Sequence, residues 1–488
     1  MISALKTIFK HRLKPMDHQD KYFQLSRTMR HYGFFWEMGT GKSKPIIDTA
    51  AWLFLTGEID GLIIISDKGC YMGWHDEEVH KHIPDGVPYR IAYWASYMQK
   101  VEKVRLENIM TAKDDMLDVL CVNVEAFSSG AATAIVERFI NSHYCLMCVD
   151  EATSIKNHTS LRTKAIKRLG LMCDYRRVCT GTPITQSPLD LFAICDFLQP
   201  GVLGFKSFVG FRSHYAVMRV MTLGPRSFQK VVGYQRLDEL TASIQPFSSR
   251  LLKTECLDLP DKIYETVYVE RTPEQEKMYA GLKDTALLQL EQGLLTSTSA
   301  ITTINKLHQI NCGHVKLDDG TVVDIPSRRA SDLMDLLEKL GDEKVIIWCR
   351  FQRDVELVMD ALYEKFGGDG LYPVHYYGKT PDSDRPVNLG KFKADPKCRW
   401  FVGTAATGGK GINGLQCVSK YVAYYSSDFN LEDRLQSEDR SHRHGQRWPV
   451  TYFDLVVRNS VDTRILDALK KKEDLSYEVL DKLREILA

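Results

Sequence analysis

A glycine-rich loop near the start of this chain has the residue types and spacing that phosphate binding requires. The loop follows the apolar residues 33–36 and precedes a helical pattern over 44–54. Glycine tolerates the positive φ angles that turn backbone N–H groups toward phosphate oxygens, and the positive end of the following helix adds to the attraction. The first glycine of the usual G-x-x-x-x-G-K-[ST] pattern is replaced by Trp36. We expect ATP and Mg²⁺ to bind here, with phosphates on the lysine and the metal on the serine hydroxyl, through Gly39, Thr40, Gly41, Lys42 and Ser43.

Two adjacent carboxylates, Asp150 and Glu151, end a second apolar run over 146–150. A carboxylate at a strand end beside a phosphate loop can hold Mg²⁺ through water, and the next one can orient or deprotonate the attacking water. The simpler alternative is a helix cap, since acidic residues suit helix N-termini. The phosphate loop favours hydrolysis, so Asp150 is predicted as the metal-holding residue and Glu151 as the residue that positions water.

Two arginines three positions apart, Arg440 and Arg443, have the chemistry to stabilise a transferring phosphoryl group. A guanidinium can donate two parallel hydrogen bonds to the oxygens that carry the developing charge. We expect a helix over 433–443, which would place both arginines on one face because residues three apart are neighbours on a helix. The alternative is a pair of surface arginines on a charged helix.

Short apolar strands that alternate with helical patterns must position these residues, and this rhythm predicts parallel sheets. A chain of 488 residues is too long for one hydrophobic core. The strands fall into two series, which predicts an α/β fold with two parallel-sheet lobes. The predicted strands are 33–36, 62–66, 118–122, 146–150 and 177–181 in the first series, and 345–349, 372–376, 400–403, 421–425 and 451–455 in the second.

The residues between the two series, about 188–330, have a more helical and less regular pattern. We assign 1–268 to lobe 1, with a helical insertion over about 188–250. We assign 269–488 to lobe 2, which begins with a helical linker or protrusion over about 269–330.

Composition excludes little. The chain has 64 basic and 63 acidic side chains, so bulk charge neither supports nor excludes a nucleic-acid partner, since binding depends on local fields. The only close cysteine pair, Cys145 and Cys148, lies in an apolar run without a second pair at zinc spacing, so we expect buried strand cysteines and no zinc. No stretch approaches the ~18 apolar residues of a membrane span, so we expect a soluble protein without a membrane partner.

Residues around these clusters form further motifs in a fixed order. Residues 150–157 read Asp-Glu-Ala-Thr-Ser-Ile-Lys-Asn, 180–183 read Thr-Gly-Thr-Pro, and 436–446 read Gln-Ser-Glu-Asp-Arg-Ser-His-Arg-His-Gly-Gln. These resemble motifs II, III and VI of the Swi/Snf-related DNA translocases of helicase superfamily 2. Shorter stretches resemble motifs Q, Ia, Ib, IV and V of that family, at 13–19, 64–68, 123–125, 345–351 and 403–413. The sequence departs from the family pattern at Thr153, where His is usual, and at Ser187, where Asn is usual.

The resemblance implies two tandem RecA-like lobes with the ATP site in the cleft between them, and sequence-independent binding of double-stranded DNA. It assigns adenine recognition to Gln19 and places Gly411 with the nucleotide-binding residues. It implies phosphate contacts on nucleic acid, and we name as candidates Lys68, Asn123, Arg350, Thr407, Gly408 and Lys410. The expected location is on DNA in the cytoplasm of a bacterium or virus-infected cell, or in a eukaryotic nucleus, with further proteins as recruiting partners.

The resemblance favours an ATP-dependent translocase that remodels protein–DNA complexes or branched DNA without separating strands. One alternative is a strand-separating helicase on DNA or RNA, which an unwinding assay would distinguish. A second is an ATP-gated scaffold that does not hydrolyse ATP. The presence of lysine, serine, both carboxylates and the arginine of motif VI together argues against a scaffold.

Overall fold

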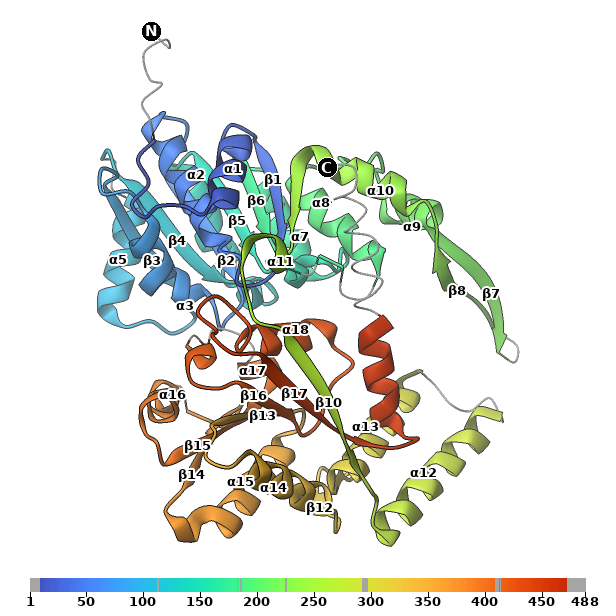
Figure 1. Cartoon of the computed structure of the whole chain (residues 1–488). Helices are drawn as coiled ribbons and strands as arrows, with labels where there is room; N and C mark the ends of the chain where they lie inside the picture. Colours follow the sequence, from blue (N-terminus) through green and yellow to red (C-terminus); the bar gives the residue numbers. More distant parts are fainter. Residues whose placement is uncertain are drawn as a thin grey trace. The chain divides into compact units, whose positions relative to one another are not determined.

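The computed structural model describes residues 9–111, 114–181, 183–184, 187–223, 226–291, 297–381, 383–408, 412 and 414–471. These residues form two compact units. The first contains residues up to 219 and 230–257, and the second contains 220–229 and 258–471. Each unit has one large parallel sheet (Figure 1), which confirms the predicted α/β fold with two lobes.

The sheet of the first unit has seven strands in the order β3-β4-β2-β5-β6-β1-β9. All of its recorded strand pairs are parallel. The five predicted strands of the first series are confirmed within two residues at each end, and the sequence pattern misses β3 and β9. The strands are β1 His31–Trp36, β2 Gly61–Ser66, β3 Tyr89–Trp94, β4 Leu117–Asn123, β5 Cys145–Asp150, β6 Tyr175–Cys179 and β9 Ser248–Leu251.

Helices cover both faces of this sheet, and the strand period explains why. Successive side chains of a strand point to opposite faces. In β2, Ile63 and Ile65 join one buried cluster, whereas Leu62 and Ile64 join another. Helices α5–α8 contribute to the first cluster, and α2, α3 and α4 contribute to the second. The helices of this unit are α1 Asp17–Ser26, α2 Ser43–Leu55, α3 Tyr71–Gly73, α4 Val79–His82, α5 Lys100–Thr111, α6 Thr133–Ser142, α7 Leu161–Gly170, α8 Leu191–Leu198, α9 Phe208–Tyr215, α10 Leu237–Ile244 and α11 Lys253–Cys256.

The sheet of the second unit has six strands in the order β10-β17-β16-β13-β15-β14, again with parallel pairs. It too has a buried cluster on each face. The strands are β10 Lys262–Val269, β13 Val345–Cys349, β14 Tyr372–Tyr376, β15 Cys398–Thr404, β16 Tyr421–Tyr424 and β17 Val450–Val457. The described helices of this unit are α12 Pro273–Glu291, α13 Ser297–Cys312, α14 Arg329–Leu340, α15 Gln352–Phe366, α16 Asp384–Ala394, α17 Ala405–Gly408 and α18 Leu431–Asp439.

Strand β10 lies in this second sheet, beside β17, although the sequence pattern assigns most of its residues to lobe 1. The chain passes from one unit to the other between Leu257 and Asp258. The strand is easy to miss because most of its side chains are exposed or half-buried, so it lacks an apolar run.

The segment predicted as a helical insertion, 188–250, is only partly helical. Between α9 and α10 it forms a two-stranded sheet of β7 Ala216–Leu223 and β8 Arg226–Tyr234. The linker region 269–330 contains the predicted helices α12 and α13, followed by a short antiparallel pair, β11 His314–Lys316 and β12 Val322–Asp324.

Two expectations from composition concern the described residues. Cys145 and Cys148 are buried in β5, as predicted, and both are free thiols. In the part of the chain that the structure describes, every helix is too short or too polar to cross a membrane.

Candidate ATP-hydrolysis site

The glycine-rich loop connects β1 to α2, as the sequence predicts. Gly39 and Gly41 have φ angles of 76° and 80°, which lie in the left-handed region that favours glycine. A β-carbon at Gly41 would also lie 2.3 Å from the side-chain nitrogen of Gln19. The Thr40 hydroxyl donates to the carbonyl of Glu37 at 2.7 Å and closes the turn.

Side chains of helix α1 hold this loop by hydrogen bonds to the backbone carbonyls of the loop. The Gln19 amide donates to the Gly41 carbonyl at 3.0 Å and accepts from the Met16 N–H at 2.9 Å. The His18 ring lies 2.9 Å from the Thr40 carbonyl. Gln19 therefore contacts the phosphate loop in this structure, and its predicted role in adenine recognition stays a prediction.

Lys42 turns back onto its own loop. Its ammonium group donates to the carbonyls of Trp36 and Glu37, at 3.0 and 3.2 Å. These carbonyls follow the end of β1, so the charge lies at the carboxyl edge of the sheet. Phosphate oxygens carry negative charge and are stronger acceptors for an ammonium group than these carbonyls.

Asp150 ends β5 at the same edge and is held by Trp74. The Trp74 indole N–H donates to Asp150 Oδ2 at 2.7 Å, and the Ser66 hydroxyl donates to the same oxygen at 3.3 Å. Burial raises the pKa of Asp150, and the carboxylate of Asp67 adds to the increase, whereas Trp74 and Lys42 oppose it. Trp74 lies six residues after the stretch that resembles motif Ia, and the sequence does not predict its contact with Asp150.

The residues present fit a magnesium ion. Mg²⁺ prefers carboxylate and hydroxyl oxygens and keeps several waters, so it needs only one or two protein ligands. Asp150 is a half-buried carboxylate whose ionised form a divalent cation would favour. Ser43 begins α2, and its hydroxyl forms a hydrogen bond with the Glu78 carboxylate. Among the residues that the structure describes, no group of three or more His, Cys, Asp or Glu side chains forms a separate metal cluster.

Glu151 has a backbone conformation that non-glycine residues rarely adopt, with φ 49° and ψ 63°. Such strain is usually retained where a side chain must be aimed. The Thr180 hydroxyl donates to the Glu151 carboxylate at 3.4 Å, which links motif II to motif III.

Motif III also packs against the phosphate loop. A β-carbon at Gly181 would lie 3.0 Å from the backbone nitrogen of Met38. The buried guanidinium of Arg250 donates to the carbonyl of Phe35 at 2.9 Å and to that of Gly181 at 3.4 Å. Arg250 thus joins β1 to motif III.

The arginines of motif VI lie in the second unit, and the predicted helix over 433–443 is too long. Helix α18 ends at Asp439, Arg440 is its C-cap and Arg443 lies in the turn that follows. The Arg440 guanidinium donates to the carbonyl of Ile412 at 2.9 Å. The argument that both arginines share one helical face is therefore wrong, because the chain leaves the helix before Arg443.

The candidate nucleic-acid contacts differ in their surroundings. Lys68 is exposed after β2, and Thr407 is half-buried in α17. The Asn123 side chain caps the following turn by accepting from the Ala126 N–H at 2.9 Å. Gly408 is buried, and a β-carbon there would lie 2.5 Å from the Trp348 ring. Lys410 and Gly411 lie outside the described residues.

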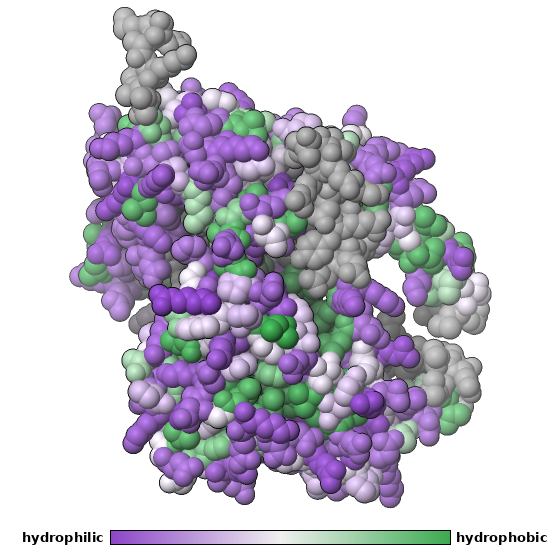
Figure 2. All heavy atoms as spheres, in the orientation of Figure 1, coloured by the Kyte–Doolittle hydropathy of each residue, from purple (hydrophilic) through white to green (hydrophobic). Residues whose placement is uncertain are grey.

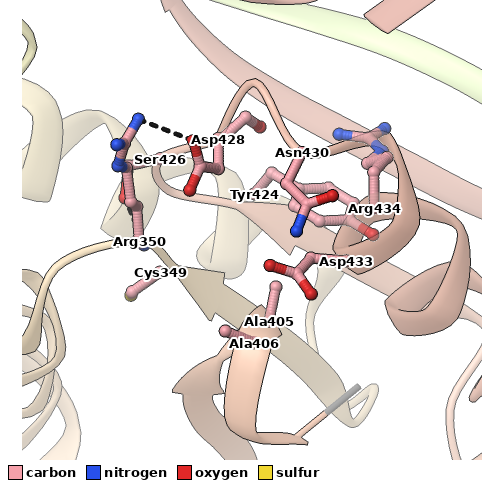
Figure 3. Close-up of a pocket in the computed structure, with 11 residues that line it drawn as sticks. Cys349, Arg350, Ala405, Ala406, Tyr424, Ser426, Asp428, Asn430, Asp433 and Arg434 are labelled. Carbon is pink, nitrogen blue, oxygen red and sulfur yellow. Dashed lines mark hydrogen bonds and ion pairs between the residues drawn. The ribbon is translucent and has the colours of Figure 1, made fainter. Parts of the chain in front are cut away.

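Arg350, the remaining candidate, is held by partners within the second unit. It pairs with Asp428 at 2.9 Å and donates to the Asn305 side chain at 2.9 Å. Figure 3 shows this ion pair beside a pocket at the carboxyl ends of β13, β15 and β16. The pocket has a volume of about 40 Å³, which suits about one water molecule and not a nucleotide.

Two protein-family models match consecutive regions of this chain. Residues 14–316 match the SNF2-related domain, and residues 328–445 match the helicase conserved C-terminal domain. The chain is 25% identical over 448 residues to an uncharacterized ATP-dependent helicase of Mycoplasma pneumoniae, covering 91% of this chain and 40% of that protein. It is 26% identical over 466 residues to the ISWI chromatin-remodeling complex ATPase CHR17 of Arabidopsis thaliana, covering 92% of this chain and 40% of the relative.

The chain therefore spans less than half the length of these curated relatives. Among solved structures it is similar to the SWI2/SNF2 ATPase core of Sulfolobus solfataricus in complex with dsDNA. The identity is 23% and the TM-score 0.42, over 97% of this chain and 98% of that one. Because the SNF2-related model matches more than half of the sequence, the chain belongs to the SNF2-related family, whose members are ATP-hydrolysing enzymes.

Proposed function

We propose that this chain is a motor that uses ATP hydrolysis to move along double-stranded DNA, without necessarily separating the strands, and so remodels protein–DNA complexes or branched DNA. The observation that carries the proposal is the cluster at the carboxyl edge of the first sheet. There the Glu151 N–H donates to the Asp150 carboxylate, the Thr180 hydroxyl of motif III donates to the Glu151 carboxylate, and Gly181 of motif III packs against the phosphate loop. A nucleotide held there would contact all four elements.

The residues of this edge would divide the chemistry between them. The loop amides and Lys42 would bind the β- and γ-phosphates, and Ser43 and Asp150 would hold Mg²⁺, which supplies charge neutralisation on the phosphates. Glu151 would orient the attacking water, which its strained backbone conformation supports. Arg440 and Arg443 are proposed to stabilise the charge that develops on the γ-phosphoryl oxygens.

Motif III offers a route by which hydrolysis could be coupled to movement. Its Thr180 contacts Glu151, and its Gly181 lies against the loop and accepts from Arg250. A change at the γ-phosphate would therefore alter the contact between Glu151 and Thr180, and with it the position of the residues that follow Gly181. Coupling of this kind needs an element with two arrangements, which motif III is proposed to be.

DNA is proposed to contact the strand ends through residues such as Lys68 and Thr407. Contacts with phosphate carry no base information, so binding should be independent of sequence and weaken as salt concentration rises. The family membership and the exposure of Lys68 support this assignment.

The proposal is tested by measuring phosphate release from ATP with no nucleic acid, blunt duplex DNA, single-stranded DNA or RNA. Lys42→Ala provides the inactive control because it removes the positive charge proposed to bind the β- and γ-phosphates. Strong stimulation by duplex, lost in Lys42→Ala, is the expected result. Stimulation by a single strand or by RNA in place of duplex would replace the translocase with a helicase, and no turnover with any polymer would contradict the motor.

A further inference from the structure

The two-stranded sheet of β7 and β8, here called the ribbon, is firmly attached at its base. Tyr215 and Ala216, where the ribbon begins, are buried. Across from them, the Gln235 N–H donates to the Tyr215 carbonyl at 2.9 Å, and its side chain donates to the His214 carbonyl at 2.9 Å. The Tyr234 hydroxyl forms a side-chain hydrogen bond with Ser187, four residues after motif III. The ribbon is thus an arm with a fixed root.

Beyond this root the ribbon exposes apolar side chains on both faces. Alternate residues of a strand point to opposite faces, yet Val220 and Met221, which are adjacent, are both exposed. Val220 is 62% exposed and Phe228 is 51% exposed. A two-stranded sheet alone is marginally stable, and an exposed group of apolar side chains usually marks a binding surface. The other exposed apolar residues are Val217 and Val232.

The ribbon also carries positive charge only. From Ala216 to Arg236 the sequence contains no Asp or Glu, whereas it contains four basic residues: Arg219, Arg226, Lys230 and Arg236. This imbalance is local, because the whole chain has a net charge of +1. Arg219 and Lys230 are exposed. The ribbon, drawn in green in Figure 1, shows hydrophobic and hydrophilic side chains next to each other in the same view in Figure 2.

We propose that the ribbon binds in a groove of the DNA duplex on which the motor moves, and this inference rests on the proposed function. The major groove is wide enough to admit a two-stranded ribbon. A strand of eight residues is about 26 Å long, which corresponds to about eight base pairs. Arg219 and Lys230 contact the phosphates that border the groove, and Phe228 and Val220 contact its apolar surfaces.

Charge decides between DNA and a protein partner. A strand of a protein partner could add to the edge of the ribbon through backbone hydrogen bonds, but this binding mode does not require basic side chains. A ribbon without any acidic residue matches a polyanion. Its root beside Ser187 would also connect groove binding with motif III.

The experiment measures binding of a fluorescent blunt duplex of about 30 base pairs to the full chain without nucleotide. Anisotropy titrations are performed between about 50 and about 200 mM salt. The main variant is the double substitution Arg219→Gln and Lys230→Gln. The matched control is Lys103→Gln with Lys339→Gln, which removes the same charge from exposed positions on α5 and α14. Phe228→Ala tests the apolar contact, and circular dichroism verifies that each variant is folded.

Loss of two phosphate contacts should reduce the slope of log affinity against log salt by about 1.8. The ratio of wild-type affinity to that of the Arg219→Gln, Lys230→Gln variant should therefore be about tenfold larger at the lowest salt concentration than at the highest. The control variant should keep the wild-type slope. Phe228→Ala should weaken binding several-fold with an unchanged slope. If both ribbon variants bind as the wild type does, the ribbon proposal is overturned and the proposed motor stands. If the wild type does not bind duplex at all, both are overturned.

Discussion

In both large sheets, charged residues lie at the carboxyl ends of the strands. The two sheets differ in whether these residues form ion pairs with other side chains or hydrogen bonds with the backbone. In the first unit, Lys42 donates to two backbone carbonyls, and burial raises the pKa of Asp150 although Trp74 and Lys42 oppose the increase. In the second unit, Arg350 pairs with Asp428, and Asp354 accepts from Ser426 and lies 2.7 Å from His314. The first edge therefore has charges suited to a ligand, whereas the second has charges that hold its own loops.

A buried ionic network in the second unit extends this contrast. Arg434 pairs with Asp454 and with Glu438, and Lys262 of β10 pairs with Glu438 as well. These residues lie on α18, β17 and β10. Helix α18 directly precedes the motif VI arginines. The same architecture thus carries the candidate ATP-hydrolysis site in one unit and a buried ionic network next to the motif VI arginines in the other. In the second unit, charged side chains pair with one another, whereas Lys42 in the first unit donates to backbone carbonyls.

Arg443→Ala should have the largest effect, and it tests whether the second unit takes part in ATP hydrolysis. If the second unit only supplies structure, the substitution leaves turnover unchanged. We expect a loss of about 10³-fold or more in nucleic-acid-stimulated phosphate release, because an arginine on the transferring phosphoryl group contributes on that order. Arg447→Ala, an exposed arginine four residues away, is the matched control and should keep wild-type turnover.

Glu151→Gln tests whether the first edge is built for hydrolysis and not only for binding. A positioned general base contributes roughly 10²- to 10⁴-fold, so turnover should fall by that order while ATP binding, measured with a fluorescent analogue, is retained. Glu364→Gln, an exposed glutamate of α15, should turn over ATP like the wild type. Wild-type turnover in Glu151→Gln would contradict the assigned role.

Glu438→Gln tests the structural role of the second unit. Burial alone would raise the pKa of Glu438, but Lys262 and Arg434 lower it to about 2. Because the folded pKa lies below the usual value of 4.5, the stabilisation is complete above about pH 4.5 and is lost as the pH falls through about 2. We expect Glu438→Gln to lower the free energy of unfolding by about 3 kcal/mol at neutral pH.

Urea unfolding of wild type and Glu438→Gln at several pH values measures this effect. The difference between the two proteins should shrink as the pH is lowered below about 4.5. A difference that is independent of pH would mean that the ion pairs do not carry the stabilisation.

Trp74→Phe should have the smallest effect and sharpens the account of the first edge. The substitution keeps an aromatic side chain, smaller than the indole, and removes the N–H that donates to Asp150 at 2.7 Å. Residues that orient a metal ligand usually affect metal affinity by about 10- to 100-fold. The Mg²⁺ concentration for half-maximal turnover should therefore rise by about tenfold. Trp448→Phe, at an exposed tryptophan, should leave it unchanged, and an equal rise in both variants would exclude a specific role for Trp74.

Strands with continuous apolar runs could be predicted from the sequence, because burial on both faces demands such runs. β2, with all six residues buried, is an example. Strands β3 and β10 lie at sheet edges and are mostly half-buried or exposed, so their composition does not separate them from loops. The sequence pattern also misses the ribbon, whose strands bury almost no side chains.

The candidate site was predictable where chemistry is local. The loop from Gly39 to Ser43 and the pair Asp150 and Glu151 need particular residue types at fixed spacing, and they lie where the sequence predicts. The bond from Trp74 to Asp150 spans 76 positions and that from Arg250 to Phe35 spans 215, so neither has a local signal.

The family, the two parallel sheets and the position of the glycine-rich loop could be predicted from the sequence, because motifs and strand burial depend on near neighbours along the chain. Only the tertiary structure decided which charges are matched. It showed that Arg350 is paired, that α18 ends before Arg443, and that an expected helical segment contains a basic ribbon. Partner choice and strand pairing depend on residues far apart in the sequence, and folding alone brings these together.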